Sequence, residues 1–234
     1  MQYSLVIPCF NEEGTIQLIL ERTKNPFIDN NIELILVNNG STDNSKNIIS
    51  QLISNYPHAK CINLEKNLGY GGGILKGLSH CKGEIIGWTH ADFQTDPLDC
   101  ISAFKEYENI SKGENTFIKG NRKTRPFIDK FFTFGMSVFE TFLLGKLIYD
   151  INAQPTIFPK KFFDSWIKPP TDFSLDLYSY YLAKKNKYKI KRISVDFPKR
   201  ISGQSKWNIN LSSKIIFILR TIKYSFKLKL NNMI

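Results

Sequence analysis

Short apolar runs alternate with helical patterns through the first half of the chain. Between the first two runs, Ile16, Ile19 and Leu20 share one face of a predicted helix. This order of strands and helices predicts an α/β fold, with a mostly parallel sheet and helices on both of its faces. Four runs have the length and apolar content of buried strands: 3–7, 32–37, 61–64 and 84–89.

Turn and capping residues separate these elements. Gly14 and Thr15 open the first helix, and Pro97 suits the first position of a later one. The polar stretch 38–44 combines a turn with residues that can cap a second helix. The glycine-rich stretch 69–73 predicts a loop.

The second half of the chain predicts fewer strands. Apolar residues predict a strand at 116–119, and polar and apolar residues alternate at 193–197 as in a half-buried strand. The simplest organisation is one domain over 1–212, followed by a basic amphipathic helix over 213–234. Three segments are predicted helices: 127–149, 174–185 and 213–229.

Charge is distributed unevenly along the chain. The 234 residues carry a net charge of +11, with a balance of −5 over 1–118 and +16 over 119–234. A basic half suits an anionic partner, such as phosphates or an anionic membrane, although a solvated basic surface would have the same composition. We expect no nucleic-acid partner, because the chain has no recognised nucleic-acid-binding motif.

The cysteines and apolar segments indicate a cytoplasmic protein without a membrane span. The apolar run at 3–7 is far too short for a signal peptide. The segment 215–230 is the best candidate for a span, but basic residues interrupt it. Its uninterrupted apolar stretches are much shorter than the roughly 18 residues that a membrane span requires. We expect free thiols, because no two cysteines have metal-ligand or redox spacing: Cys9, Cys61, Cys81 and Cys100.

Polar residues and glycines gather where the predicted strands end. Ligands bind beyond the carboxyl ends of strands in an open parallel sheet, so these loops predict a site. The glycines at 69–73 do not follow the first strand, which excludes a dinucleotide-binding fingerprint. They fit a tight turn and a phosphate contact equally well. Four loops meet at this edge: 8–13, 38–43, 67–73 and 90–96.

Alternating polar residues after the fourth strand predict a metal site. In extended chain, His90, Asp92 and Gln94 point the same way and offer a ring nitrogen, a carboxylate and an amide oxygen. A divalent cation held by few protein groups and by substrate phosphates fits this set. Such an ion would stabilise a departing diphosphate. A polar turn at the strand end is the alternative.

Six segments, in order, resemble those of family-2 glycosyltransferases, especially the branch that contains dolichol-phosphate mannose synthases and polyprenyl-phosphate glycosyltransferases. The resemblance runs from about residue 3 to residue 207. It implies a GT-A-type fold, a UDP- or GDP-sugar donor, and Mn²⁺ or Mg²⁺ as cofactor. The segments are IPCFNE at 7–12, NNGSTD at 38–43, NLGYG at 67–71, HADFQ at 90–94, GNR at 120–122 and RISGQSK at 200–206.

The resemblance also implies roles for individual residues. Asp92 and Gln94, with His90, would hold the metal. If the acceptor is a hydroxyl group, Asp176 or the nearby Asp172 would be the general base. Asp172 would equally suit a helix N-cap. Arg122, Arg200 and Lys206 would contact phosphates. Catalysis would depend on Asp92, Asp176, Arg200 and Lys206. The nucleotide would be bound by Pro8, Phe10, Glu12, Asn38, Asn39, Gly69 and Arg122.

Three positions depart from the family's pattern. Asn38 and Asn39 replace an acidic pair, which leaves the preferred nucleotide open. His90 replaces the first acid of the metal motif, and histidine suits Mn²⁺ better than Mg²⁺. Tyr178 stands where the branch often has a second acid.

The leading hypothesis is an inverting hexosyltransferase of cell-envelope glycan biosynthesis, acting on a polyprenyl phosphate or a lipid-linked saccharide. The alternative is an inactive binding or accessory protein on the same fold. We expect peripheral attachment to the inner face of the membrane, because the helix at 213–229 has an apolar face beside basic residues. Packing of that face onto the core is the competing interpretation. The basic residues are Arg220, Lys223 and Lys227.

Overall fold

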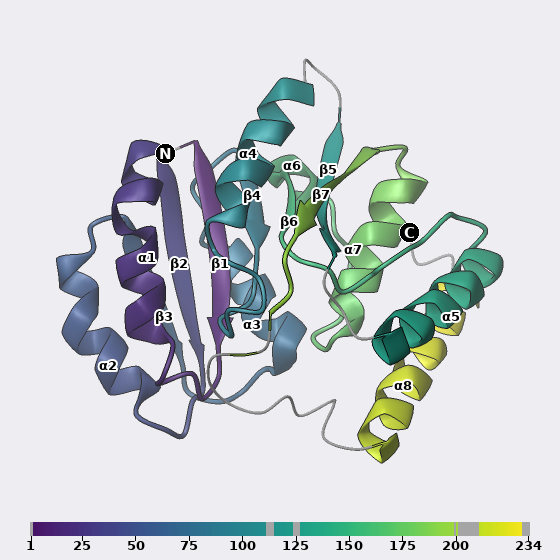
Figure 1. Cartoon of the computed structure of the whole chain (residues 1–234), viewed down its shortest axis with the longest axis horizontal. Coiled ribbons are helices and arrows are strands. Elements are labelled where there is room, and N and C mark those ends of the chain that lie inside the picture. Colours follow the sequence, from purple (N-terminus) through teal and green to yellow (C-terminus); the bar gives the residue numbers. More distant parts are fainter. Residues whose placement is uncertain (1, 111–114, 124–126, 199, 201–210, 231–234) are drawn as a thin grey trace.

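The protein forms one twisted sheet with helices on both faces and a pair of helices at one end (Figure 1). The computed structural model describes residues 2–110, 115–123, 127–198, 200 and 211–230. Within these ranges, seven strands form the sheet in the order β3-β2-β1-β4-β6-β5-β7. The strands are β1 (Tyr3–Cys9), β2 (Ile32–Asn39), β3 (Ala59–Leu64), β4 (Ile85–Trp88), β5 (Thr116–Arg122), β6 (Thr156–Pro159) and β7 (Lys189–Val195).

The sheet is parallel except at β6. Strand β1 pairs in parallel with β2 and β4, β2 pairs with β3, and β5 pairs with β7. Strand β6 runs antiparallel between β4 and β5. This arrangement confirms the predicted mostly parallel α/β sheet. The helices are α1 (Ile16–Asp29), α2 (Ser45–Leu52), α3 (Gly69–Leu78), α4 (Asp99–Ile110), α5 (Phe127–Leu144), α6 (Lys160–Asp164), α7 (Ser174–Lys185) and α8 (Leu211–Leu230).

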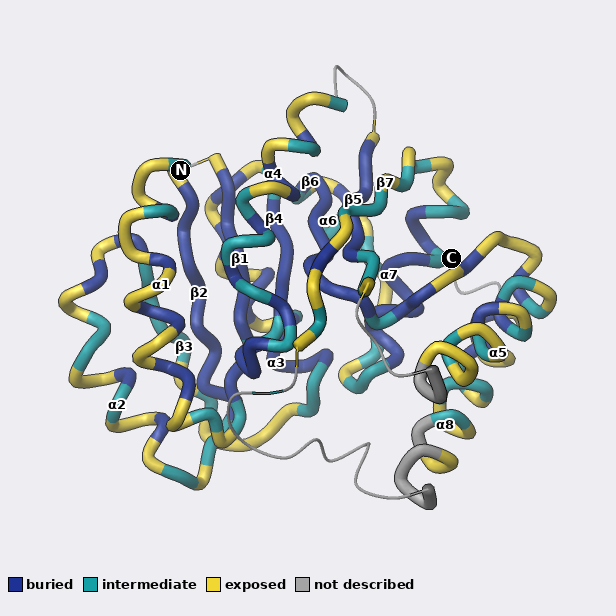
Figure 2. The backbone as a smooth tube through the Cα atoms, viewed as in Figure 1, coloured by how far each residue is buried: buried dark blue, intermediate teal, exposed yellow. Residues whose placement is uncertain are grey.

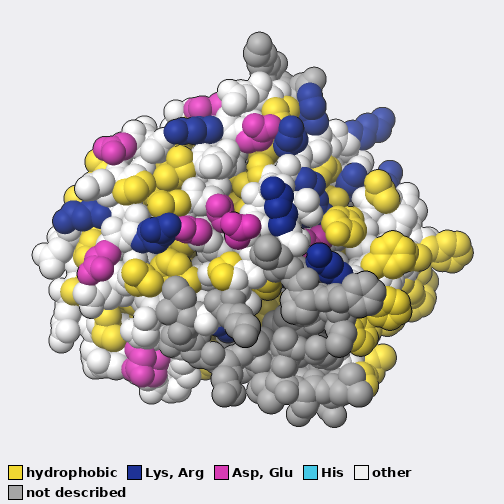
Figure 3. Space-filling model, viewed as in Figure 1, with side chains coloured by type: hydrophobic (Ala, Val, Ile, Leu, Met, Phe, Trp, Pro, Cys, Tyr) yellow, Lys and Arg dark blue, Asp and Glu magenta, His cyan; other side chains and the backbone are white. Residues whose placement is uncertain are grey.

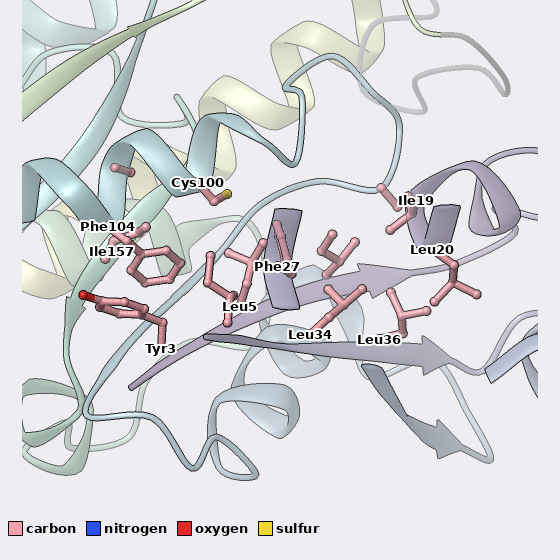
Figure 4. Packing of buried hydrophobic residues seen from close by; sticks show 14 of the residues in the cluster. Tyr3, Leu5, Ile19, Leu20, Phe27, Leu34, Leu36, Cys100, Phe104 and Ile157 are labelled. Carbon is pink, nitrogen blue, oxygen red and sulfur yellow. The ribbon is translucent and has the colours of Figure 1, made fainter. Parts of the chain in front are cut away.

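Alternation along the strands divides the core into two layers. Leu5 and Ile7 face the layer that contains α1, α2 and α4, while Val6 faces the layer that contains α3, α6 and α7. Figure 4 shows the first layer, where Phe27 and Phe104 pack against the sheet from their helices. The central strands are buried on both faces (Figure 2), so they read as continuous apolar runs.

The predicted glycine loop at 69–73 is wrong, because these residues begin helix α3. The glycines serve a close backbone approach. A Cβ on Gly71 would lie 2.7 Å from the carbonyl oxygens of Pro170 and Asp172. The Gly72 N–H donates to the Thr171 carbonyl oxygen at 2.9 Å. Only glycine allows the segment 170–172 to pass so near the helix.

Strand β6 was not predicted from the sequence. It is only four residues long, it follows Pro155 and it ends at Pro159. All four residues are buried, because β6 lies inside the sheet between two neighbours. A run this short carries no periodicity, so tertiary pairing alone defines it.

Helices α5 and α8 pack against each other at one end of the molecule, and α8 also contacts α7 (Figure 1). The predicted C-terminal helix is therefore present. None of the described helices combines the length and hydropathy that a membrane crossing needs.

Candidate active site

A cavity of about 870 Å³ opens where β1, β2 and β4 end. Four groups of residues line it. The first comes from the ends of β1, β2 and β4 and from the segments that follow β1, β3 and β4, and it includes Pro8, Asn39, Tyr70 and His90. The start of α7 supplies the second group. The third lies later along the chain: Arg122, Ile151, Asn152, Phe197 and Arg200. Helices α5 and α8 supply the fourth, which is largely apolar: Phe132, Thr133, Met136, Ser137, Ile216, Ile218 and Arg220.

The cavity brings together most of the residues singled out from the sequence. Asn38 does not line it, and Lys206 lies outside the described residues. The predicted residues on its wall are Pro8, Phe10, Glu12, Asn39, Gly69, His90, Asp92, Gln94, Arg122, Asp172, Asp176 and Arg200.

The polar loops after β1 and β2 bind to each other. Asn11 has a positive φ of 58°, a conformation that asparagine tolerates. Its Oδ1 accepts the Thr42 N–H at 2.8 Å, and its Nδ2 donates to Thr42 Oγ1 at 3.1 Å. The carboxylate of Glu13 accepts the Asn44 N–H at 2.9 Å. The polar residues of these two loops, at 11–13 and 42–44, therefore fix the rim of the cavity.

The two asparagines at the end of β2 point to different surroundings, as strand alternation requires. Asn38 donates to Asn63 Oδ1 at 3.0 Å and accepts the Ser41 N–H at 3.2 Å. Asn39 donates to the Gly69 carbonyl oxygen at 2.9 Å and accepts the Leu68 N–H at 3.0 Å. Asn39 therefore connects β2 to the start of α3 at the cavity wall.

Asp92 and Gln94 converge on one cationic group. Asp92 is 5% exposed, and its Oδ1 accepts the Gln94 N–H at 3.1 Å. Its Oδ2 lies 2.8 Å from Arg200 Nη2. The Nε of Arg200 donates to Gln94 Oε1 at 3.1 Å. The carboxylate and amide oxygens are therefore placed so that one cation can contact both.

These residues fit a divalent cation that is completed by substrate oxygens. Among the described residues, no three His, Cys, Asp or Glu side chains gather into a ready-made metal site. Hard divalent ions commonly take only one or two protein carboxylates plus phosphates. His90 lines the same cavity, and burial lowers its pKa despite the opposing effect of Asp92. A neutral imidazole is the form that binds metals.

Glu12 lies in the same electrostatic environment. Burial and the Asp92 carboxylate raise its pKa to about 7, and Arg200 opposes this rise. Thr15 Oγ1 donates to Glu12 Oε2 at 3.3 Å. Glu12, Asp92 and Arg200 thus form a mixed-charge group on the wall of the cavity.

Asp176 belongs to a buried hydrogen-bonded network under the cavity. Its Oδ1 accepts Lys119 Nζ at 3.1 Å and Gln154 Nε2 at 2.7 Å. Its Oδ2 accepts the Tyr70 hydroxyl at 3.0 Å. Lys119 and Asp176 are 0% and 1% exposed, and Lys119 also donates to Thr156 Oγ1. Three donors therefore hold the carboxylate of Asp176.

This network could not be recognised from the sequence. Lys119 and Gln154 come from β5 and the segment before β6, and neither belongs to a polar motif. Two of its members carried a signal: Asp176, through the family resemblance, and Tyr70, inside the segment 67–71. The Tyr70 ring stacks on the Phe173 ring, with centroids 4.4 Å apart. The centroid of the Tyr70 ring also lies 5.7 Å from that of the His90 ring.

Arg122 lines the cavity and is also bound to a carboxylate. It forms an ion pair with Asp150, and both side chains are buried. The ring of Phe197 lies 5.0 Å from the Arg122 guanidinium carbon. Nearby, Asp172 Oδ1 accepts the Ser174 N–H at 2.9 Å. Asp172 precedes Phe173, which is the N-cap of α7, so it is not itself the N-cap.

Comparison with known sequences supports a glycosyltransferase. Residues 4–166 match the family model described as Glycosyl transferase family 2. A dolichyl-phosphate beta-glucosyltransferase, ALG5D, of Trichomonas vaginalis is 24% identical over 92% of this chain and 73% of its own length. A dodecaprenyl-phosphate galacturonate synthase of Rhizobium johnstonii is 23% identical over 98% of this chain and 68% of its own length.

Comparison with solved structures supports the fold. A glucosyl-3-phosphoglycerate synthase of Mycobacterium tuberculosis, crystallised with Mn²⁺, uridine diphosphate and glucosyl-3-phosphoglycerate, has a TM-score of 0.73. It is 15% identical, and the match covers 97% of this chain and 79% of that protein. At this identity the likeness concerns the GT-A-type architecture.

Proposed function

The chain belongs to glycosyl transferase family 2, and from this premise we propose that it transfers a sugar from a nucleotide-diphosphate-sugar to a lipid acceptor. The donor would be a UDP- or GDP-sugar, and the transfer would invert the anomeric centre. The acceptor would be a polyprenyl phosphate or a lipid-linked saccharide. The names of the relatives, which include a dolichyl-phosphate and a dodecaprenyl-phosphate enzyme, support this choice.

The observation that carries the proposal is the composition of the cavity wall. The wall combines Asp92 and Gln94, at the strand ends, with apolar residues of α5 and α8. A nucleotide sugar needs the polar residues, and an isoprenoid chain needs apolar surface. Phe132, Met136 and Ile216 offer that surface within the same cavity. One cavity can therefore hold both substrates at adjacent positions.

We propose that Asp92, Gln94 and His90 hold Mn²⁺ or Mg²⁺ together with the donor diphosphate. When bound, such an ion neutralises the charge that develops on the leaving diphosphate. His90 favours Mn²⁺, since imidazole is a better ligand for transition metals than for Mg²⁺. Pro8, Phe10, Glu12 and Asn39 would line the nucleoside side of the cavity.

A phosphate acceptor suits the hydrogen bonds of Asp176. A general base must take a proton from the acceptor, but both oxygens of Asp176 are held by Lys119, Gln154 and Tyr70. An ionised lipid phosphate needs no strong base. We therefore assign Asp176 to positioning Tyr70 at the cavity wall. Arg200 and Arg122, with Lys206 from outside the described residues, would contact phosphates.

We propose that α5 and α8 rest on an anionic membrane surface. Their exposed apolar side chains form what we call the α5–α8 surface: Phe131, Phe132, Phe134, Val138, Phe142, Ile215, Ile216, Leu219, Phe226 and Leu230. Figure 3 shows hydrophobic side chains gathered over α5, at the right edge of the view. Arg220, Lys223 and Lys227 of α8 line a second cavity of about 450 Å³ beside the start of α7. Apolar and basic groups together are typical of helices that lie in the headgroup layer.

Transfer of labelled sugar to polyprenyl phosphate tests the function. The purified chain is incubated with Mn²⁺, a panel of UDP- and GDP-sugars and a short-chain polyprenyl phosphate, and lipid-linked label is measured. We expect transfer from one of the donors. Donor binding in calorimetry without transfer or hydrolysis would instead support the inactive accessory protein. A matched reaction with Asp92→Asn controls for contaminating transferases.

A further inference from the structure

Arg200 contacts the same oxygen atoms that the divalent cation would use. Its Nη2 lies 2.8 Å from Asp92 Oδ2, and its Nε donates to Gln94 Oε1 at 3.1 Å. Each of these hydrogen bonds uses one of the two lone pairs of its acceptor oxygen. The guanidinium also repels a second cation at this distance. A metal ion and this arrangement of Arg200 therefore compete for the same two oxygen atoms.

The other polar atoms of the two ligands are already bound within the protein. Asp92 Oδ1 accepts the Gln94 N–H at 3.1 Å, and Gln94 Nε2 donates to the Pro198 carbonyl oxygen at 3.4 Å. These bonds orient Oδ2 of Asp92 and Oε1 of Gln94 towards Arg200. A metal ion at either of these oxygens therefore meets the Arg200 guanidinium as a competing cation.

Of the two charged partners, Arg200 is the one that can leave. The side chain of Arg200 is 25% exposed, whereas that of Asp92 is 7% exposed. A guanidinium that moves outward regains water at little cost, while a buried carboxylate left alone must be given another cation. The negative surroundings reinforce this need, because Glu12 contributes a second carboxyl group to the same wall.

We propose that Arg200 is a built-in competitor of the divalent cation at Asp92 and Gln94. The metal with its nucleotide diphosphate displaces the guanidinium, and the displaced guanidinium then becomes available to the acceptor anion. Arg200 thereby weakens binding of metal alone and favours binding of donor before acceptor. The inference rests on the proposed function, from which it takes the metal, the donor and the acceptor. By linkage, forming the Arg200 contact weakens metal binding by the same factor by which bound metal weakens that contact, so removing Arg200 should strengthen metal binding.

Binding of Mn²⁺ in the absence of nucleotide tests this inference without an activity assay. Free Mn²⁺ is measured by its electron paramagnetic resonance signal as the full chain is added. Arg200→Gln should bind Mn²⁺ about tenfold tighter than the wild type, equivalent to about 1.4 kcal/mol. Arg200→Lys keeps the charge but loses the two-point contact, so it should fall in between. It also serves as the second variant if Arg200→Gln fails to fold by circular dichroism.

Arg22→Gln is the matched control. Arg22 pairs with Asp96, in the loop that also carries Asp92, but it contacts neither Asp92 nor Gln94. The Arg22→Gln substitution removes the same charge as Arg200→Gln from the same region. Because Arg22 belongs to an exposed ion pair, whose free energy is small, the substitution should change Mn²⁺ affinity by less than about twofold. Equal gains in Arg22→Gln and Arg200→Gln would show a general charge effect and overturn the inference.

Asp92→Asn separates failure of this inference from failure of the proposed site. We expect it to lose the Mn²⁺ binding seen in the wild type and in Arg200→Gln. If Asp92→Asn loses Mn²⁺ but Arg200→Gln binds no tighter than the wild type, the competitor role is overturned while the metal site stands. If Asp92→Asn binds Mn²⁺ normally, the metal assignment and the inference both fall. Absence of donor binding in calorimetry would refute the transferase proposal separately.

Discussion

The hydroxyl oxygen of Ser225, on α8, lies 2.6 Å from Oε1 of Glu140, which is fully buried on α5. The same hydroxyl lies 2.8 Å from the Thr221 carbonyl oxygen, yet it has only one hydrogen to donate. A protonated Glu140 satisfies both contacts, because it donates to Ser225 while Ser225 donates to Thr221. Burial raises the pKa of Glu140 to about 7, so the neutral form is accessible near neutrality.

Glu140→Gln should stabilise the protein above pH 7. The pKa of Glu140 rises from 4.5 to about 7 on folding. Between these values the folded state binds more protons than the unfolded state, so the free energy of unfolding falls as pH rises through this window. Glutamine removes that loss, so the variant should gain up to about 3 kcal/mol at pH 8 and little at pH 4.5. Urea unfolding at both pH values measures the effect. Glu21→Gln, on an exposed position of α1, should show no such difference.

Helices and strands were predicted well where a local pattern of apolar residues defined them. They were predicted poorly where contacts between distant parts of the chain defined the element. The buried runs of β1 and β2 and the helix at 174–185 needed only local patterns. Glu140 gave no sign of its burial, because its partner is 85 residues away along the chain. The residues of the proposed metal site could be predicted because strand ends meet at one edge of a parallel sheet, and the structure places them on one cavity wall. The three donors around Asp176 could not be predicted, since Lys119 looks in the sequence like an ordinary basic residue at a strand end.

Lys119→Met should destabilise the fold by about 3–5 kcal/mol, because it leaves the buried Asp176 carboxylate without its charged partner. Chemical denaturation of the folded chain measures this loss. Lys191→Met provides the comparison. Lys191 pairs with Glu106 at the surface, and breaking that pair should cost less than about 1 kcal/mol. Equal losses in both variants would contradict a buried ion pair.

Asp92→Ala should remove turnover while leaving the fold intact. The side chain supplies the one carboxylate of the proposed metal site, and it is not a member of either apolar core cluster. Loss of metal-assisted charge stabilisation should lower the rate by on the order of a hundredfold or more. Initial rates with saturating donor measure this, and circular dichroism confirms folding. Activity close to that of the wild type would exclude Asp92 as a metal ligand.

His90→Asp should move the metal preference from Mn²⁺ towards Mg²⁺. The wild type has an imidazole at this position of the cavity, and an additional carboxylate oxygen suits the harder ion. Initial rates at equal concentrations of the two metals give the preference for each protein. His80→Asp, on an exposed histidine after α3, is the control and should leave it unchanged. A wild type that prefers Mg²⁺ would show that His90 does not contact the metal.

Charged substitutions on the α5–α8 surface should prevent binding to vesicles. Phe142, on α5, is 89% exposed, and Leu219, on α8, is 58% exposed. If both side chains enter the headgroup layer, replacing either with Asp removes about 1.5–3 kcal/mol of apolar burial, so partitioning should weaken by roughly tenfold or more. Flotation with vesicles that contain anionic lipid measures the bound fraction. Added salt should reduce binding by the wild type, because each Lys or Arg near the surface contributes about 1 kcal/mol that salt screens.

Ile28→Asp is the matched control for this surface. Ile28 is an exposed apolar residue of α1, at the end of the molecule opposite α5 and α8 (Figure 1). It removes the same kind of side chain and adds the same charge, so a general effect of charge on vesicle binding would appear in it as well. We expect Ile28→Asp to float like the wild type while Phe142→Asp and Leu219→Asp stay in the soluble fraction. If all three variants float equally, the exposed apolar side chains of α5 and α8 do not enter the membrane.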